Sequence, residues 1–195
     1  MAYGITDLAT FILGTVFIVL LPGPNSLYVM ALASRHGVAA GYRGAAGIFA
    51  GDLVLMLLST AGAASLLRST PLAFMLVKYI GAAYLAWLGL GLVRAAWRQW
   101  TALPAQAATA RPRDPKLEQS PGRPFRTAFL ISLMNPKAIL FFVSFFIQFV
   151  DPGYAHPALS FLLLGLIVQG CSALYLSALI FGGVRLAERF GDGHG

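Results

Sequence analysis

Four polar side chains lie inside stretches that are otherwise apolar. Asp52 follows the run GIFAG, and Lys137 lies in LMNPKAIL (133–140). Asn25 stands in LLPGPNSLYVM (20–30), and Asn135 directly precedes Pro136. Ionisable groups in apolar surroundings are costly, and they usually face a partner or a cavity. A carboxylate, an ammonium and two amides can exchange a proton and bind a polar solute.

Two of these side chains stand at expected breaks in a helix. Pro22, Gly23 and Pro24 precede Asn25, and Asn135 begins the run Asn135-Pro136-Lys137. An interior Pro costs a helix about 3 kcal/mol relative to Ala, and Gly costs about 1 kcal/mol. Half-helix N-termini suit a carboxylate, and carbonyls freed by Pro suit an ammonium. Kinks of purely structural meaning are the alternative, but the two breaks together predict a substrate site that suits an amino acid, formed by Pro22, Gly23, Pro24, Asn25, Asn135, Pro136 and Lys137.

The composition indicates that lipid surrounds these residues. The chain has 195 residues, of which 58% are hydrophobic and only 11% charged, and its mean hydropathy is +0.75. A soluble domain carries about 25% charged residues. A helix crosses a bilayer with about 20 apolar residues. We therefore expect an all-α, polytopic membrane protein of one domain, with about five spans at 5–34, 41–67, 71–93, 125–150 and 158–184.

The polar residues fall at similar depths in these expected spans. Asn25, Asp52, Asn135 and Lys137 lie about 14 to 18 Å from the cytoplasmic ends, at 1.5 Å per helical residue. The first and fourth spans enter from opposite sides, and each carries Asn beside Pro near the midplane. A Pro-broken helix at the same place in each half is the pattern of an inverted repeat.

Charge is distributed unevenly among the connectors. Seven basic and two acidic residues lie between Arg94 and Arg126, and Arg35 and Arg43 lie between the first two spans. Basic connectors face the cytoplasm. We predict an N-terminus outside, a cytoplasmic Pro-rich loop at 94–124 and a C-terminal tail at 185–195 inside. The loop lacks interleaved aromatic residues, so its positive charge does not predict nucleic-acid binding.

The remaining polar residues leave alternatives open. Asp52 could pair with Lys137, could carry a proton during transport, or could do both. Gln148, Gln169 and Lys78 are possible pathway residues. The two glutamines could equally bond a neighbouring helix, and Lys78 could snorkel outward. Gly47 and Gly51 form a GxxxG pattern, which favours close helix packing within or between chains. The three histidines show no metal-ligand spacing, and we expect no cofactor.

Four stretches together resemble a known family. They are LLPGPNSLYVM, GIFAGDLVLM, KYIGAAYLAWLGLGL and LMNPKAILFFVSFFIQFV, and they are similar to the lysine/homoserine exporter (LysE/RhtB) family, most closely its leucine-exporter-like branch. The resemblance implies a transporter of the bacterial inner membrane that exports amino acids in exchange for protons. It places functional weight on both breaks and on Asp52, and the export direction comes from the resemblance alone.

The resemblance also raises a rival interpretation. Family members usually have six spans, whereas this chain offers five. The alternative is therefore a truncated membrane interaction or scaffold protein of the same fold that does not transport. A membrane-embedded enzyme is the least favoured class, because no nucleophile or clustered catalytic group is apparent. Homo-oligomerisation is compatible with the GxxxG pattern but is not specified by it.

Overall fold

The computed structural model describes residues 3–69, 123–151 and 153–191, together with single positions between Leu72 and Trp97. Its described elements are α1 (Leu8–Leu20), α2 (Pro24–Ser69), α4 (Pro124–Leu133), α5 (Pro136–Leu140), a π-helical turn (Phe141–Phe145), a 3-10 turn (Phe146–Phe149) and α6 (Pro157–Gly191). Within the described residues no strand forms, apart from a single bridge between Ile5 and Val150. The all-α prediction is confirmed. Most of the predicted loop at 94–124 and about half of the span at 71–93 lie outside the described residues.

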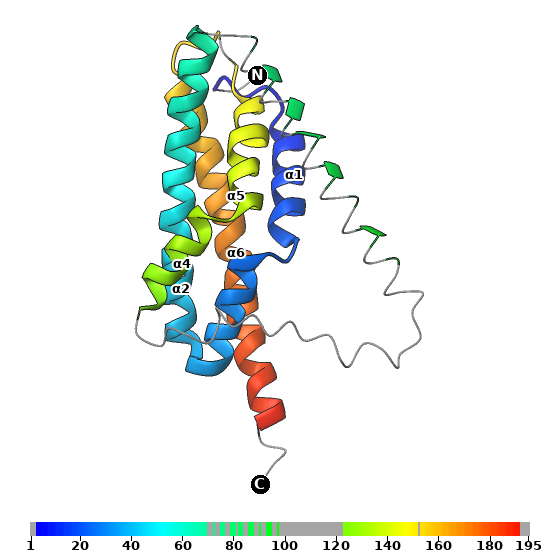
Figure 1. Ribbon diagram of the computed structural model, residues 1–195, viewed down its shortest axis with the longest axis vertical. Coiled ribbons are helices and arrows are strands. Elements are labelled where there is room, and N and C mark those ends of the chain that lie inside the picture. The colour runs from blue at the N-terminus through cyan, green and yellow to red at the C-terminus, as the bar shows by residue number, and fades with distance from the viewer. Residues whose placement is uncertain are drawn as a thin grey trace.

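Helix α2 is a hairpin of two helical arms. Gly37 interrupts the helical dihedrals with φ 81° and ψ 177°, a conformation that glycine adopts without steric strain. The arms fold back on one another, so a Cβ added at Gly41 would approach the Ala33 side chain within 2.9 Å. The first arm continues the direction of α1 after a break, and the second arm returns beside it (Figure 1). The spans predicted at 5–34 and 41–67 correspond to α1 with the first arm and to the second arm, and both stay predictions.

Breaks occur in both places that the sequence predicts. Residues 21–23 separate α1 from α2, and the chain bends by 52° between α4 and the helical segment Pro136–Phe149. Among the described residues, Pro24–Gly62 and Pro157–Arg189 are long and apolar enough to cross a membrane, and the bent pair Pro124–Phe149 would be a third crossing. Helix α1 is shorter than a full span. The number of five spans stays a prediction.

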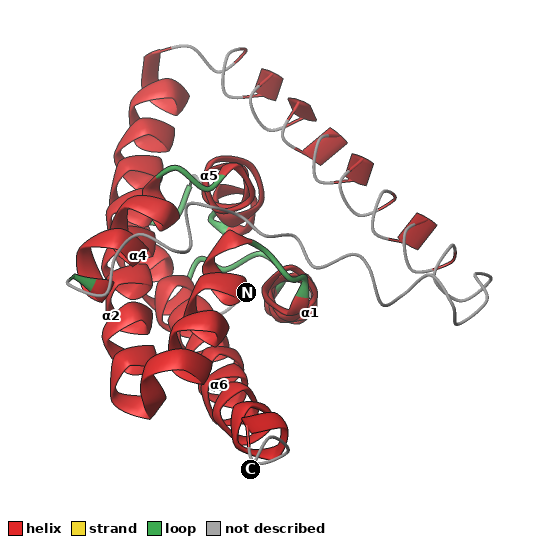
Figure 2. Ribbon diagram, turned by 60° about the horizontal axis from the view of Figure 1, so that its bottom comes forward, coloured by secondary structure: helices red, strands yellow, loops and turns green. Residues whose placement is uncertain are grey.

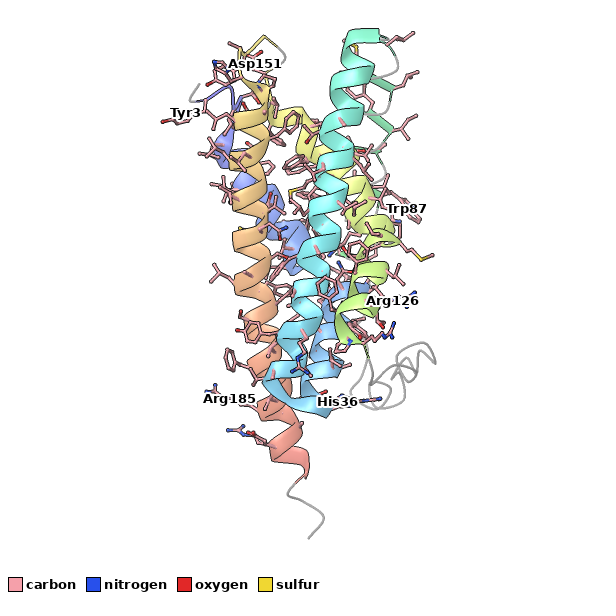
Figure 3. All side chains as sticks on the ribbon, turned by 90° about the vertical axis from the view of Figure 1, so that its left-hand side faces the viewer. Tyr3, His36, Trp87, Arg126, Asp151 and Arg185 are labelled. Carbon is pink, nitrogen blue, oxygen red and sulfur yellow. The ribbon has the colours of Figure 1, made fainter. Side chains whose placement is uncertain are left out.

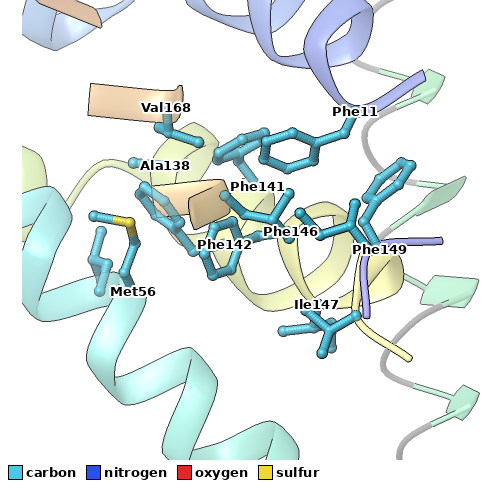
Figure 4. Packing of buried hydrophobic residues seen from close by; sticks show 13 residues of the cluster. Phe11, Met56, Ala138, Phe141, Phe142, Phe146, Ile147, Phe149 and Val168 are labelled. Carbon is cyan, nitrogen blue, oxygen red and sulfur yellow. The ribbon is translucent and has the colours of Figure 1, made fainter. Parts of the chain in front are cut away.

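Two hydrophobic clusters hold the described helices together. One cluster surrounds Phe11, Phe142 and Phe146, whose rings pack between α1 and the segment after α5 (Figure 4). The other surrounds Val29, Ile48 and Ile180, which come from both arms of α2 and from α6. Helix α6 lies between α1 and α2 and contacts both (Figure 2). Large apolar side chains also point outward, including Leu13, Leu58 and Leu174, which are 71%, 64% and 77% exposed. Such a surface suits lipid.

The two ends of the bundle differ in their residues. Tyr3 and Asp151 lie at one end, whereas His36, Arg126 and Arg185 lie toward the other (Figure 3). Backbone bonds tie the first end together, because the Thr6 N–H donates to the Phe149 carbonyl at 3.0 Å and the Asp151 N–H to the Gly4 carbonyl at 2.8 Å. His36, Arg126 and Arg185 thus lie together toward the opposite end.

Candidate functional site

The first break frees a carbonyl that a lysine from the other half of the chain then binds. In a continuous helix, the Ile18 carbonyl accepts from the N–H four residues later, but that residue is Pro22, which has none. Lys137 Nζ donates instead, to the Ile18 carbonyl at 3.0 Å and to the Leu21 carbonyl at 2.7 Å. A positive charge also complements the negative end of α1.

The second proline of this break has a similar effect. Pro24 cannot donate to the Leu20 carbonyl, which accepts from the Tyr175 hydroxyl of α6 at 3.4 Å. Gly23 is held locally, because its N–H donates to Ser26 Oγ at 2.9 Å and its carbonyl accepts from that hydroxyl at 3.0 Å. The break between α1 and α2 is therefore stabilised by side chains of α2, α5 and α6.

The second break begins a new helix with a buried amide. Asn135 caps α5, since its Oδ1 accepts from the Lys137 N–H at 3.0 Å. Pro136 cannot donate to the Ser132 carbonyl, which accepts from the Asn135 N–H at 3.1 Å instead. Asn135 is only 2% exposed, and its Nδ2 has no hydrogen-bond partner within the described residues. A buried donor of this kind is available to a ligand.

A serine connects Asp52 to the first break. Ser132 Oγ donates to Asp52 Oδ1 at 2.5 Å, and Asn25 Nδ2 donates to Ser132 Oγ at 3.4 Å. Ser132 is fully buried and Asp52 is 7% exposed. Asn25 Oδ1, like the Asn135 amide nitrogen, is buried without a partner in the described part of the chain. Ser132 was not predicted from the sequence, because a lone serine in an apolar helix carries no distinguishing pattern.

Close packing of α2 on α4 brings Ser132 to Asp52. A Cβ added at Gly51 would lie 2.7 Å from Ser132 Cβ and 3.0 Å from its Oγ, and one added at Gly47 would collide with the Phe125 carbonyl. The GxxxG glycines therefore serve helix packing inside this chain. Because these glycines directly precede Asp52, the GxxxG pattern is the sequence signal that another helix packs closely beside that residue.

A cavity joins both breaks. Its polar lining includes Asn25, Asp52, Asn135 and Lys137, with Ser26, Ser172 and Tyr175, and its apolar lining includes Ile48, Phe141, Phe142, Val168 and Leu176. The space between atoms along it amounts to about 560 Å³, a volume that includes the part open to the surroundings. Asp52 and Lys137 share this cavity, yet no salt bridge within 4.0 Å joins them in the described chain. Four residues predicted from sequence are thus brought together.

The other candidates lie elsewhere. Gln148 Nε2 donates to the Ser144 carbonyl of its own helical segment at 2.6 Å, and Gln169 Nε2 donates to the Phe49 carbonyl of α2 at 3.1 Å. Neither lines the cavity, and the prolines and Gly23 shape the break without lining it. Lys78 lies outside the described residues.

Comparison with known proteins gives a consistent result. Residues 16–194 match the family model described as LysE type translocator. An uncharacterized membrane protein of Pseudomonas aeruginosa is 59% identical over 187 residues, which cover 96% of this chain and 84% of that protein. Leucine efflux proteins of Enterobacter sp. and Salmonella typhimurium are 42% and 40% identical over 185 and 190 residues, covering 93% and 97% of this chain and 81% and 84% of theirs. No solved structure matches the chain.

Proposed function

Because the chain belongs to the family of LysE type translocators, we propose that it exports leucine-like amino acids from the cytoplasm through the cavity between its two helix breaks, in exchange for protons carried by Asp52. The family membership makes the protein a membrane transporter of amino acids and not an enzyme. Relatives named leucine efflux proteins support the choice of substrate. The same relationship disfavours the scaffold alternative.

The observation that carries this proposal is the meeting of both breaks with Asp52 and Lys137 in one cavity. An amino acid is a zwitterion and needs both signs of partner. Its ammonium suits Asn25 Oδ1 and the carbonyls at the end of α1, and its carboxylate suits Asn135 Nδ2, which has no partner among the described residues. Phe142, Val168 and Leu176 offer an apolar wall to an aliphatic side chain.

Asp52 is the group that we assign to the proton. It is a buried carboxyl group on the cavity, and its described partner is the Ser132 hydroxyl, not a cation. An ionised carboxylate without a counter-ion costs more to bury than a neutral carboxyl group. Exchange of a proton at this position is therefore sensitive to any charge that enters the cavity.

Efflux from cells loaded with dipeptide tests the proposal. Cells that lack their own exporters would express the protein and take up leucine-containing dipeptides, and leucine outside the cells would be followed over minutes. We expect rapid release from wild type and loss of release from Asp52→Asn, Asn25→Ala and Asn135→Ala at equal membrane levels. Thr60→Ala is the matched control, because the Thr60 hydroxyl only bonds the Met56 carbonyl of its own helix.

Each outcome discriminates between interpretations. Undiminished efflux from both asparagine variants would overturn the assigned site. Undiminished efflux from Asp52→Asn would remove Asp52 from the transport cycle. Absence of release from well-inserted wild type, with a panel of other amino acids equally silent, would favour the non-transporting scaffold.

A further inference from the structure

We infer that the Lys137 ammonium is a tethered substitute for the ammonium group of the substrate. The substrate displaces it from the Ile18 and Leu21 carbonyls, and the freed lysine then pairs with Asp52, which releases its proton. This inference rests on the proposed function and adds the means by which substrate and proton exclude one another. It assigns Lys137 a positioning role that acts through Asp52.

The first step is competition for the same carbonyls. Lys137 Nζ is held by the Ile18 carbonyl at 3.0 Å and the Leu21 carbonyl at 2.7 Å, and Ile18 also lines the cavity. A lysine ammonium and the α-ammonium of an amino acid carry the same charge and the same three N–H donors. Two cations cannot occupy this position together, because like charges at such a separation repel strongly in a medium of low dielectric constant.

The second step is the destination of the displaced lysine. Among the described residues that line the cavity, the titratable side chains are Asp52, Lys137 and Tyr175. Asp52 is therefore the carboxylate with which the displaced lysine can pair. Asp52 comes from α2 and Tyr175 from α6, while α1 and α4 add no charged side chain to the lining. The lysine side chain runs past Gly23, where an added Cβ would lie 3.4 Å from Nζ. Its flexible four-carbon stem permits movement between partners.

The third step conserves charge and protons. Before substrate binds, the cavity holds a protonated Asp52 and a Lys137 ammonium on the carbonyls. When the zwitterion arrives, its ammonium takes the carbonyls, Lys137 pairs with the Asp52 carboxylate, and the proton that leaves Asp52 passes to water. No other covalent bond forms or breaks. Binding of substrate and binding of the proton then exclude each other, which is the condition that exchange of one for the other requires.

Proton release from purified protein tests this directly. Leucine would be added to weakly buffered detergent samples containing a pH-indicator dye, at several starting pH values. We expect wild type to release one proton per bound leucine at pH values where Asp52 starts protonated. Lys137→Gln should bind leucine without releasing a proton, and its affinity should not vary with pH. Arg126→Gln, which removes one positive charge from the exposed part of α4, should behave as wild type.

Two analogues of leucine test the same step without any variant. Isoamylamine carries the ammonium and the apolar group of leucine, and 4-methylpentanoate carries the carboxylate and the apolar group. We expect the amine alone to release protons from wild-type protein and the acid to release none. This pair decides the question even where Lys137→Gln fails to fold.

The outcomes separate this inference from the proposed function. Leucine binding with no proton release from wild type, full release from folded Lys137→Gln, or release by the acid but not by the amine would each overturn the role of Lys137 and leave amino-acid transport in place. Failure of wild type to bind any amino acid would overturn the proposed function, and this inference with it.

Discussion

Pro22 and Pro24 shape the cavity through the N–H groups that they lack. Each removes the donor for one carbonyl of α1, and the donors that replace them come from α5 and α6. A proline in a membrane helix is tolerated where neighbouring side chains satisfy the freed backbone. The two prolines leave carbonyls without their helical donors, and Lys137 and Tyr175, which are distant in sequence, supply the replacement donors.

Pro22→Ala should stabilise the helix and damage transport. It restores an N–H that reaches the Ile18 carbonyl once Leu21, which is extended in the break, turns helical. That N–H then competes with Lys137 for the oxygen. Relative to Pro, Ala favours a helix interior by about 3 kcal/mol. We expect a higher midpoint of thermal unfolding together with loss of leucine efflux. Pro157→Ala, at the start of α6 where Pro is well tolerated, serves as the control. Full efflux from Pro22→Ala would mean that the freed carbonyl is not needed.

Ser132→Ala should weaken transport through Asp52. The change removes the hydroxyl that donates to Asp52 and accepts from Asn25. Leaving a buried polar group unsatisfied costs about 1–3 kcal/mol, which corresponds to a fall in efflux of about 5-fold to 150-fold if the cost falls on the transition state. Efflux at matched membrane levels would be compared with that of Ser34→Ala, whose hydroxyl bonds only its own helix through the Ala31 carbonyl. Equal rates from both variants would show that Ser132 does not assist Asp52.

At the scale of elements, the approach of α2 to α4 decides which side chains can meet. Gly47 and Gly51 lie against Phe125 and Ser132, so two backbones come close at the level of Asp52. The two breaks place helix ends at the cavity, because α1 ends there and α5 begins there. A π-helical turn follows α5 and supplies Phe141 and Phe142 to the cavity wall. Such turns are frequent at functional sites.

Gly51→Ala should move Ser132 away from Asp52. A Cβ at this position would come within 2.7 Å of Ser132 Cβ, so α4 must shift. We expect reduced leucine efflux and a lower midpoint of thermal unfolding. Gly62→Ala is the matched control on the same helix, because an added Cβ there meets nothing within 4 Å. A Gly51→Ala protein as active and as stable as Gly62→Ala would contradict the close packing of α2 on α4.

At the scale of the whole molecule, charge predicts which end faces the cytoplasm. His36, Arg126 and Arg185 lie toward one end, and Asp151 lies at the other (Figure 3). Basic residues remain on the cytoplasmic side during insertion. Residues of both hydrophobic clusters line the cavity, with Phe142 and Val168 from one cluster and Ile48 and Leu176 from the other.

Labelling of single cysteines tests this orientation. Cys171 is the sole cysteine, so Cys171→Ser provides a background without thiols. In intact cells, a membrane-impermeant maleimide should modify Asp151→Cys but not His36→Cys. In inside-out vesicles the pattern should reverse. Modification of His36→Cys from outside would show that the chain is inserted in the opposite sense.

The sequence by itself determined the environment, the helical class and the breaks. Apolar composition and proline chemistry are local properties, so the interruptions beside Asn25 and Asn135 could be located without knowledge of the fold. Equal depth along the expected spans also brought Asp52 and Lys137 into the same candidate site. The number of spans and the orientation remain predictions of the same kind.

Only the tertiary structure decided which atoms meet. The rotation of each helix about its axis turns Gln148 and Gln169 away from the cavity lining, although their polar character within apolar spans made them candidates. The approach of helices distant in sequence places Ser132 on Asp52 and Lys137 on the carbonyls of α1. Depth can be estimated by counting residues along one helix, whereas these contacts depend on how several helices pack together.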